Sequence, residues 1–264
     1  MELSFQLADP AGNITLLVTT PVPREDHPAL AAGLLSIPEL HAEQVGFLVP
    51  PQGEGVIRLE MMGGEFCGNA LRCAGLYYAV QQGRRRAGRF PVEVSGYDKA
   101  LSVQVNPLAN QVSVEMPLPQ TVQSCTLFGA AAQAVLLPGI VHAVSFLPPE
   151  QPEEAVREAL EGLARDYAVP AAGVMFWDRQ RSTLTPAVYV QGNSSLYFER
   201  SCASGSTAVA ACHALSSQRD GSFKLALKQP GGTIHTTATL RGGKLQQLTI
   251  GGVVSLGQSY TLEF

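Results

Sequence analysis

No stretch of the sequence has the length of uninterrupted apolar residues that a membrane-spanning helix needs. The first residues, MELSFQLADPAGN, lack the basic start and the long apolar core of a secretory signal peptide. Charged residues are few, 15% of 264, and the net charge of −4 argues against a dedicated nucleic-acid-binding protein. We therefore expect a cytoplasmic protein with neither a membrane nor a nucleic-acid partner.

Cysteine is also scarce. Five cysteines, an odd number spread over the whole chain, do not form a disulfide framework, and thiols stay reduced in the cytoplasm. No Cys-x-x-Cys pair is present, so we predict no metal site. The cysteines interpreted as packing residues are Cys73, Cys125 and Cys212. The histidines interpreted as structural residues are His142, His213 and His235.

What the sequence does contain is an internal repeat. Cys67 and Cys202 lie in similar glycine-containing segments, and one constant offset relates them. The same offset relates Gly96 to Gly231 and Met116 to Gly251, and a slightly shorter one relates Gly12 to Gly139 upstream. The chain therefore reads as two copies of one unit.

Each copy predicts the same elements in the same order. A β-branched strand ends at prolines, an acidic helix start follows, and a second strand leads to the cysteine and a helix of small residues. Alternating strands close each copy. The expected strands are 14–19 with 141–146 and 43–49 with 171–177, and the expected helices are 70–82 and 207–216.

We therefore predict an α+β fold of two pseudo-symmetric lobes, residues 1–118 and 119–264, with the last strand able to return to the first lobe. Small-molecule sites commonly lie in clefts between lobes, so the active site is expected there.

The two cysteines of the repeat suggest a chemistry. A helix N-terminus carries unbonded N–H groups and the positive end of the helix dipole, so it can hold a carboxylate and lower the pKa of a thiol. One cysteine in such a place is weak evidence, because free cysteine is commonly buried and inert. Two at equivalent points could place one thiol on each face of a ligand. Racemising an amino acid requires removing the α-proton from one face and returning a proton to the other, which two flanking thiols can do without moving.

The motifs resemble those of the diaminopimelate epimerase family, which includes proline racemase. CGNALRC (67–73) resembles the epimerase motif Cys-Gly-Asn-Gly-x-Arg-Cys, SCASGS (201–206) resembles its Cys-Gly-Ser/Thr-Gly partner, and PAGN (10–13) resembles the N-terminal Gly-x-Gly-Asn. The resemblance covers essentially the whole chain. It implies the family's fold, no cofactor such as pyridoxal phosphate, and catalysis by Cys67 and Cys202. It is also compatible with a homodimer, since relatives are often dimers.

Departures from that family weigh against diaminopimelate as the substrate. Ile140 in GIVH replaces an Asn of the epimerase segment Gly-Asn-Pro-His, and Glu60 falls where another Asn is expected. The pair Glu199–Arg200 directly precedes SerCys rather than standing several residues upstream, so we interpret it as a superficial match. Without those donors, a substrate with a second charged end would be strongly disfavoured.

The histidine racemases of staphylopine-type metallophore pathways resemble this sequence more closely than the diaminopimelate epimerases do. The segments that carry this resemblance are DPAGN, EQVGF, GGEFCGNA, RSCASG and QPGG. That resemblance implies that Asn13 and Asn69 help to place the ligand and that Glu43 accepts a hydrogen bond from an imidazole N–H. Ala203 replaces the usual glycine, which is tolerable only at negative φ. The substrate-binding residues implied are Asn13, Glu43, Gly68, Asn69, Ala203 and Ser204.

The sequence therefore predicts a cofactor-independent amino-acid racemase that interconverts L- and D-histidine for opine-type metallophore synthesis, with Cys67 and Cys202 alternating as base and acid. One alternative is a diaminopimelate epimerase or a racemase of another amino acid. An alternative of another class is a non-catalytic amino-acid-binding protein, which would not need two thiols in matched loops.

Overall fold

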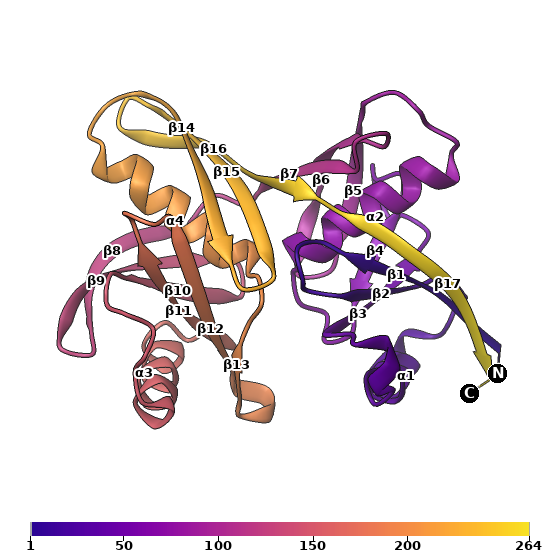
Figure 1. The fold of residues 1–264 in the computed structure, drawn as a ribbon, viewed down its shortest axis with the longest axis horizontal. Coiled ribbons are helices and arrows are strands. Elements are labelled where there is room, and N and C mark those ends of the chain that lie inside the picture. Colours follow the sequence, from indigo (N-terminus) through magenta and orange to yellow (C-terminus); the bar gives the residue numbers. More distant parts are fainter. Residues whose placement is uncertain (1, 264) are drawn as a thin grey trace. The chain divides into compact units, whose positions relative to one another are not determined.

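The computed structural model describes residues 2–263, which form an α+β fold made mostly of strands with four α-helices (Figure 1). The chain divides into two compact units, Met1–Glu115 with Gly251–Phe264, and Met116–Ile250. The lobe boundary expected after residue 118 stays a prediction. None of the helices in residues 2–263 combines the length and the apolar character that a membrane crossing requires.

The first unit contains two α-helices, two short 3-10 helices and eight strands among its described residues. The strands are β1 (Glu2–Asp9), β2 (Thr15–Val18), β3 (Gln44–Val49), β4 (Arg58–Met61), β5 (Gly88–Val94), β6 (Tyr97–Asn106), β7 (Gln111–Met116) and β17 (Ser255–Glu263). The helices are η1 (Arg24–Asp26), α1 (His27–Leu35), η2 (Pro38–Leu40) and α2 (Gly68–Gln81). The C-terminal strand β17 runs antiparallel along β1, so the two ends of the described chain lie side by side (Figure 1).

The second unit contains the remaining elements. Its strands are β8 (Thr121–Leu127), β9 (Ala130–Leu137), β10 (Ile140–Ser145), β11 (Ala171–Asp178), β12 (Thr183–Val190), β13 (Ser195–Phe198), β14 (Gly221–Gln229), β15 (Gly232–Arg241) and β16 (Lys244–Val253). Its helices are α3 (Glu153–Asp166), η3 (Gln191–Asn193) and α4 (Ala203–Ser216). The amphipathic helix α3 buries Val156, Leu160 and Leu163, spaced at helical intervals, and begins with two glutamates that suit the helix dipole.

Strand pairing confirms the internal repeat. In the first unit β2 pairs parallel with β3, β3 antiparallel with β4, β4 parallel with β5, and β5 antiparallel with β6. In the second unit the same alternation joins β10 with β11, β11 with β12, β12 with β14, and β14 with β15. The two units therefore share one topology, and the predicted strands lie within about two residues of the observed ones.

Each unit wraps its strands around one central helix. Helix α2 packs against β2, β4, β5 and β6, and helix α4 packs against β9, β10, β11, β14 and β15 (Figure 1). Both helices are buried on nearly every side, which small residues permit: a Cβ on Gly75 would come within 2.5 Å of Val103 Cγ1. Cys73 is 0% exposed and Cys212 is 5% exposed, so both pack in the core as predicted.

Candidate active site

Helix α2 begins at Gly68, immediately after Cys67, and not at residue 70 as predicted. Cys67 has extended backbone angles (φ −134°, ψ 110°) and is the N-cap residue, because its Sγ accepts a hydrogen bond from the Ala70 N–H at 3.4 Å. Cysteine is not among the residues preferred at N-caps, so the sequence signal for a helix start was absent here. The half-buried thiol therefore lies in the positive field of the helix N-terminus.

A second contact ties this thiol to the neighbouring strands. Cys67 Sγ donates to Gln44 Oε1 at 3.2 Å, and Gln44 Nε2 donates to Thr15 Oγ1 at 2.7 Å. Gln44 and Thr15 are both buried. The sulfur therefore has a fixed position relative to β2 and β3.

Asn69 and the turn before β2 are held by a residue that the sequence analysis left unassigned. The guanidinium of Arg72 is fully buried, and its Nη2 donates to Pro10 O and to Asn69 Oδ1, both at 2.8 Å. Burial lowers the pKa of Arg72 from its ordinary value. Arg72 thus holds the Pro10–Asn13 turn against the start of α2. The sequence feature that could have indicated this role is the position of Arg72 in the CGNALRC motif.

Two predicted ligand-binding residues, Asn13 and Glu43, meet in the first unit. Asn13 Nδ2 donates to Glu43 Oε2 at 3.1 Å, while the buried Asn13 Oδ1 has no hydrogen-bond partner among the described residues. The Thr15 hydroxyl donates to the Asn13 carbonyl at 3.2 Å, which connects this pair to the Cys67 side chain through Gln44. The first unit therefore brings Asn13, Glu43 and Cys67 into one network.

The second unit repeats the cysteine cap. Cys202 (φ −123°, ψ 113°) precedes α4, and its Sγ accepts a hydrogen bond from the Gly205 N–H at 3.3 Å. Ala203 is the first residue of the helix, where φ is negative, so the expected tolerance of alanine at this position is confirmed. The helix again starts immediately after the cysteine and not at residue 207 as predicted, because the cysteine is the N-cap here too.

The backbone of Cys202 is enclosed by side chains. Its N–H donates to Gln229 Oε1 at 2.9 Å, Gln229 Nε2 donates to Ser206 Oγ at 2.9 Å, and Ser206 Oγ donates to the Cys202 carbonyl at 2.7 Å. These three bonds close a ring, and all three residues are buried. Gln229, in the QPGG motif, therefore fixes the cap residue in place.

Burial raises the pKa of the Cys202 thiol well above its ordinary value, and the negative charge of Glu199 raises it further. Hydrogen bonds from Ser204 and from the Gly205 N–H act in the opposite direction. Glu199 also shares a hydrogen bond with the thiol. Glu199 therefore contacts Cys202 even though the family's intervening loop is missing, a contact that our interpretation of the Glu199–Arg200 pair as a superficial match did not predict.

His142 was interpreted as structural, but it lies within hydrogen-bond distance of a predicted site residue: its Nε2 is 2.8 Å from Ser204 Oγ. No sequence signal marks this contact, because the two residues are far apart in the chain and meet only when β10 packs on α4. His213, by contrast, packs edge-on against Trp177 and Phe223, as a structural histidine does.

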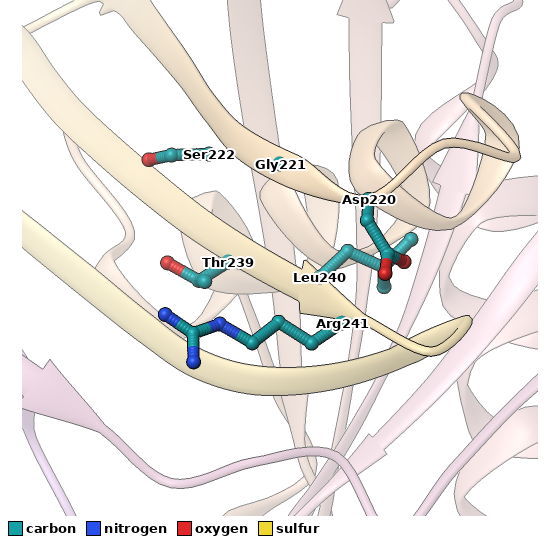
Figure 2. A pocket seen from close by; sticks show the side chains of 6 residues that line it. All are labelled: Asp220, Gly221, Ser222, Thr239, Leu240 and Arg241. Atoms are coloured by element: carbon teal, nitrogen blue, oxygen red, sulfur yellow. The ribbon is translucent and has the colours of Figure 1, made fainter.

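Neither cysteine lines either of two surface hollows. One, of about 540 Å³, is formed by Asp220–Ser222 and Thr239–Arg241 at the ends of β14 and β15 (Figure 2). There, the Asp220 carboxylate accepts bonds from the Gly242 and Gly243 N–H groups, so its charge already stabilises the turn. The other, of about 620 Å³, adjoins Glu93, whose carboxylate is bonded to backbone N–H groups at positions 52, 53 and 55. In both hollows, a lining carboxylate is already bonded to backbone N–H groups.

Comparison with known proteins indicates the family. The profile of the histidine racemase CntK N-terminal domain matches residues 2–260. A histidine racemase of Fusobacterium nucleatum subsp. nucleatum is 31% identical over 217 residues, 78% of this chain and 79% of that protein. A histidine racemase of Staphylococcus aureus is 27% identical over 247 residues, 89% of this chain and 88% of that protein.

Solved structures share the fold at low sequence identity. A predicted epimerase from Pseudomonas aeruginosa has a TM-score of 0.69 at 13% identity and covers 99% of both chains. A hydroxyproline epimerase from Agrobacterium vitis has a TM-score of 0.64 at 12% identity and covers 99% of this chain and 91% of its own. Since the family profile spans nearly all of the sequence, and the similarity to the Fusobacterium racemase extends over most of it, the chain belongs to the histidine racemase CntK family.

Proposed function

We propose that this protein interconverts L- and D-histidine without a cofactor, with Cys67 and Cys202 as the two acid–base groups. The observation that carries the proposal is that each thiol caps the central helix of one repeat, at the equivalent point of the same topology. A binding protein would need the helix N-termini, but it would have no use for a thiol at both of them.

The proposed reaction moves two protons. The thiolate of one cysteine takes the α-proton, and the electron pair left on the α-carbon delocalises into the carboxylate. The thiol of the other cysteine then donates its proton to the opposite face, which gives the other enantiomer and leaves the thiolate on that side. The first amides of α2 and α4 have no carbonyl of their own helix to bond to, so those of Gly68 and Ala203 are suited to stabilise the carboxylate as it gains charge.

The protonation state of Cys202 fits the acid of this scheme. Because its pKa is raised well above its ordinary value, the thiol carries its proton at neutral pH. Cys67, whose Sγ lies at the N-terminus of α2, would then act as the base once it has lost to solvent the proton that it donates to Gln44 Oε1. For the opposite substrate the roles exchange, and Cys202 must then act as the thiolate.

The imidazole of histidine is a hydrogen-bond donor, and it suits two hydrogen-bond acceptors of the first unit. Asn13 Oδ1 is a buried acceptor without a partner among the described residues, and the Glu43 carboxylate lies next to it. An imidazole N–H would satisfy such an acceptor, and a buried acceptor left unpaired costs free energy. We further propose that the D-histidine formed is consumed in the synthesis of an opine-type metallophore.

Substituting Glu43 with Gln should lower kcat/KM for histidine roughly ten- to hundredfold, mainly through KM, because an amide oxygen accepts the imidazole N–H more weakly than a carboxylate does. Glu39→Gln, an exposed carboxylate in η2, is the matched control and should leave both constants unchanged. Steady-state kinetics with L- and D-histidine measure the effect. Equal kinetics for Glu43→Gln and Glu39→Gln would show that the imidazole is not recognised by Glu43.

The proposed function is tested by incubating the reduced protein with single L-amino acids in D₂O. Deuteration at Cα is read by NMR, and D product by chiral chromatography. We expect deuterium incorporation and D product with histidine, and neither with the Cys67→Ser/Cys202→Ser double variant. If only diaminopimelate were turned over, the substrate would be diaminopimelate and not histidine. If no amino acid exchanged its α-proton, the proposal that the protein is a racemase would be rejected.

A further inference from the structure

The imidazole of His142 fills the space beside Gly173, which has no side chain. His142 is 0% exposed on β10 and pairs across the parallel ladder with Gly173 on β11. A Cβ at Gly173 would come within 2.5 Å of His142 Nδ1, so the imidazole occupies the place of a missing side chain. The ring position is therefore fixed by packing, and only its Nε2 edge reaches a described polar partner.

From that edge a short chain of contacts leads to the reactive sulfur. His142 Nε2 is 2.8 Å from Ser204 Oγ, and Ser204 Oγ is 3.5 Å from Cys202 Sγ. Ser204 is half-buried, in the first turn of α4, whereas Cys202 is 5% exposed. The histidine can thus influence the thiol through a single hydroxyl group.

Burial and tautomer decide the direction of these hydrogen bonds. Burial lowers the pKa of His142 to about 3, so the ring is neutral and carries one proton. His142 Nδ1 is buried without a partner among the described residues, and a buried unpaired N–H is rarer than a buried unpaired acceptor. The proton therefore belongs on Nε2, where Ser204 Oγ accepts it. A hydroxyl that accepts from His142 directs its own proton elsewhere, and Cys202 Sγ is the acceptor within reach.

We propose that His142 is a positioning residue, which holds the Ser204 hydroxyl as a hydrogen-bond donor to the Cys202 thiolate. This inference rests on the proposed function, in which Cys202 must become a thiolate in one direction of the reaction. Burial and the Glu199 carboxylate both oppose that ionisation. The Ser204 hydroxyl and the Gly205 N–H are the contacts that favour it, and only the hydroxyl needs a partner to set its direction.

The first unit has a matching chain built from different residues. There the thiol of Cys67 bonds to Gln44, and Gln44 bonds to Thr15. Thr15 and His142 are equivalent positions of the repeat, because the offset that relates them is the one that relates Gly12 to Gly139. In both units one polar side chain therefore links the cysteine to the same position of the repeat.

The hydrogen-bond direction can be tested without any activity. In protein labelled with ¹⁵N-histidine, long-range proton–nitrogen NMR should show His142 as a neutral Nε2–H tautomer that does not titrate between pH 5 and 9. Ser204→Ala should shift the His142 Nε2 resonance and leave the other histidines unchanged. A proton found on Nδ1, or a ring that titrates in this range, would overturn the proposal.

The second test asks whether His142 acts through Ser204. His142→Phe keeps a ring but removes the donor, and should lower kcat for histidine roughly ten- to hundredfold with little change in KM. His142→Gln keeps an N–H near the Nε2 position and should recover most of the loss. In a Ser204→Ala background, His142→Phe or His142→Gln should cause little further loss, because contacts in one chain are not additive.

Equal losses from the His142 substitutions with and without Ser204 would mean a merely structural role and would reject the proposal. If His142→Phe does not fold, the His142→Gln comparison in the two backgrounds and the tautomer measurement still decide the question. A wild-type protein that does not racemise histidine would reject the proposed function instead, whatever the tautomer.

Discussion

Cys202→Ser and Cys67→Ser should each lower the rate of histidine racemisation by at least roughly 10²- to 10⁴-fold, the range expected for loss of one acid–base group. A serine hydroxyl is much less acidic than a thiol, so it cannot ionise to accept the α-proton. Each change replaces one sulfur by oxygen, and the N-cap hydrogen bond at either helix can persist, because serine is a preferred N-cap residue. The fold should therefore survive while the chemistry is lost.

The matched control is Cys125→Ser, a half-buried strand cysteine at the edge of a core cluster. It should keep full activity. Each single variant that retains one working thiolate should still exchange the α-proton of one enantiomer with D₂O and yield no inverted product. The enantiomer that each variant exchanges would assign each cysteine to its face of the substrate. Inversion at more than a tenth of the wild-type rate by either variant would contradict a two-thiol mechanism.

The fold was largely predictable because its signals are local and occur twice. Alternation of apolar residues predicted the strands, and the offset of the two cysteines predicted a shared topology, which the parallel and antiparallel pairings confirm. The helix starts were predicted two to four residues too late. Cys67 and Cys202 are themselves the caps, and a thiol accepting from a backbone N–H leaves no familiar pattern in the sequence.

The contacts around the predicted site residues were less predictable, because some of them form only through tertiary packing. Asn13 and Glu43 could be chosen from motifs, and the structure brings their side chains together. Glu199 was dismissed on a spacing argument, yet the chain lets it reach Cys202 over three residues. His142 reaches Ser204 only because Gly173 on the next strand leaves room for its ring. This contact depends on the missing side chain of Gly173, and a single sequence does not show that Gly173 lies beside His142.

The turn that contains Gly96 supports the segment leading to Cys67. Ser95 Oγ accepts from the Met61 N–H at 2.9 Å and donates to the Glu65 carbonyl at 2.8 Å, so the turn lies against residues 65–66. Gly96 itself has φ +72°, and a Cβ there would come within 2.4 Å of Phe66 N and 2.8 Å of Glu65 C. The repeat partner Gly231 likewise contacts the chain before its cysteine, since its N–H donates to the Arg200 carbonyl at 2.7 Å.

Gly96→Ala should therefore destabilise the protein by about 2–4 kcal/mol, from left-handed backbone strain together with a clash against main-chain atoms that cannot rotate away. It should also lower kcat of the folded fraction, because relieving the clash displaces Phe66, the residue next to Cys67. Gly83→Ala is the matched control: φ is +61°, but nothing lies within 4 Å of its Cβ, so only the strain of about 1–2 kcal/mol remains and activity is kept. Urea unfolding followed by circular dichroism, with kinetics at a concentration where each variant is folded, separates the two effects. Equal stability losses for the two variants would mean that residues 65–66 yield freely to the added methyl group. Wild-type kcat in folded Gly96→Ala would show that the position of Cys67 does not depend on this turn.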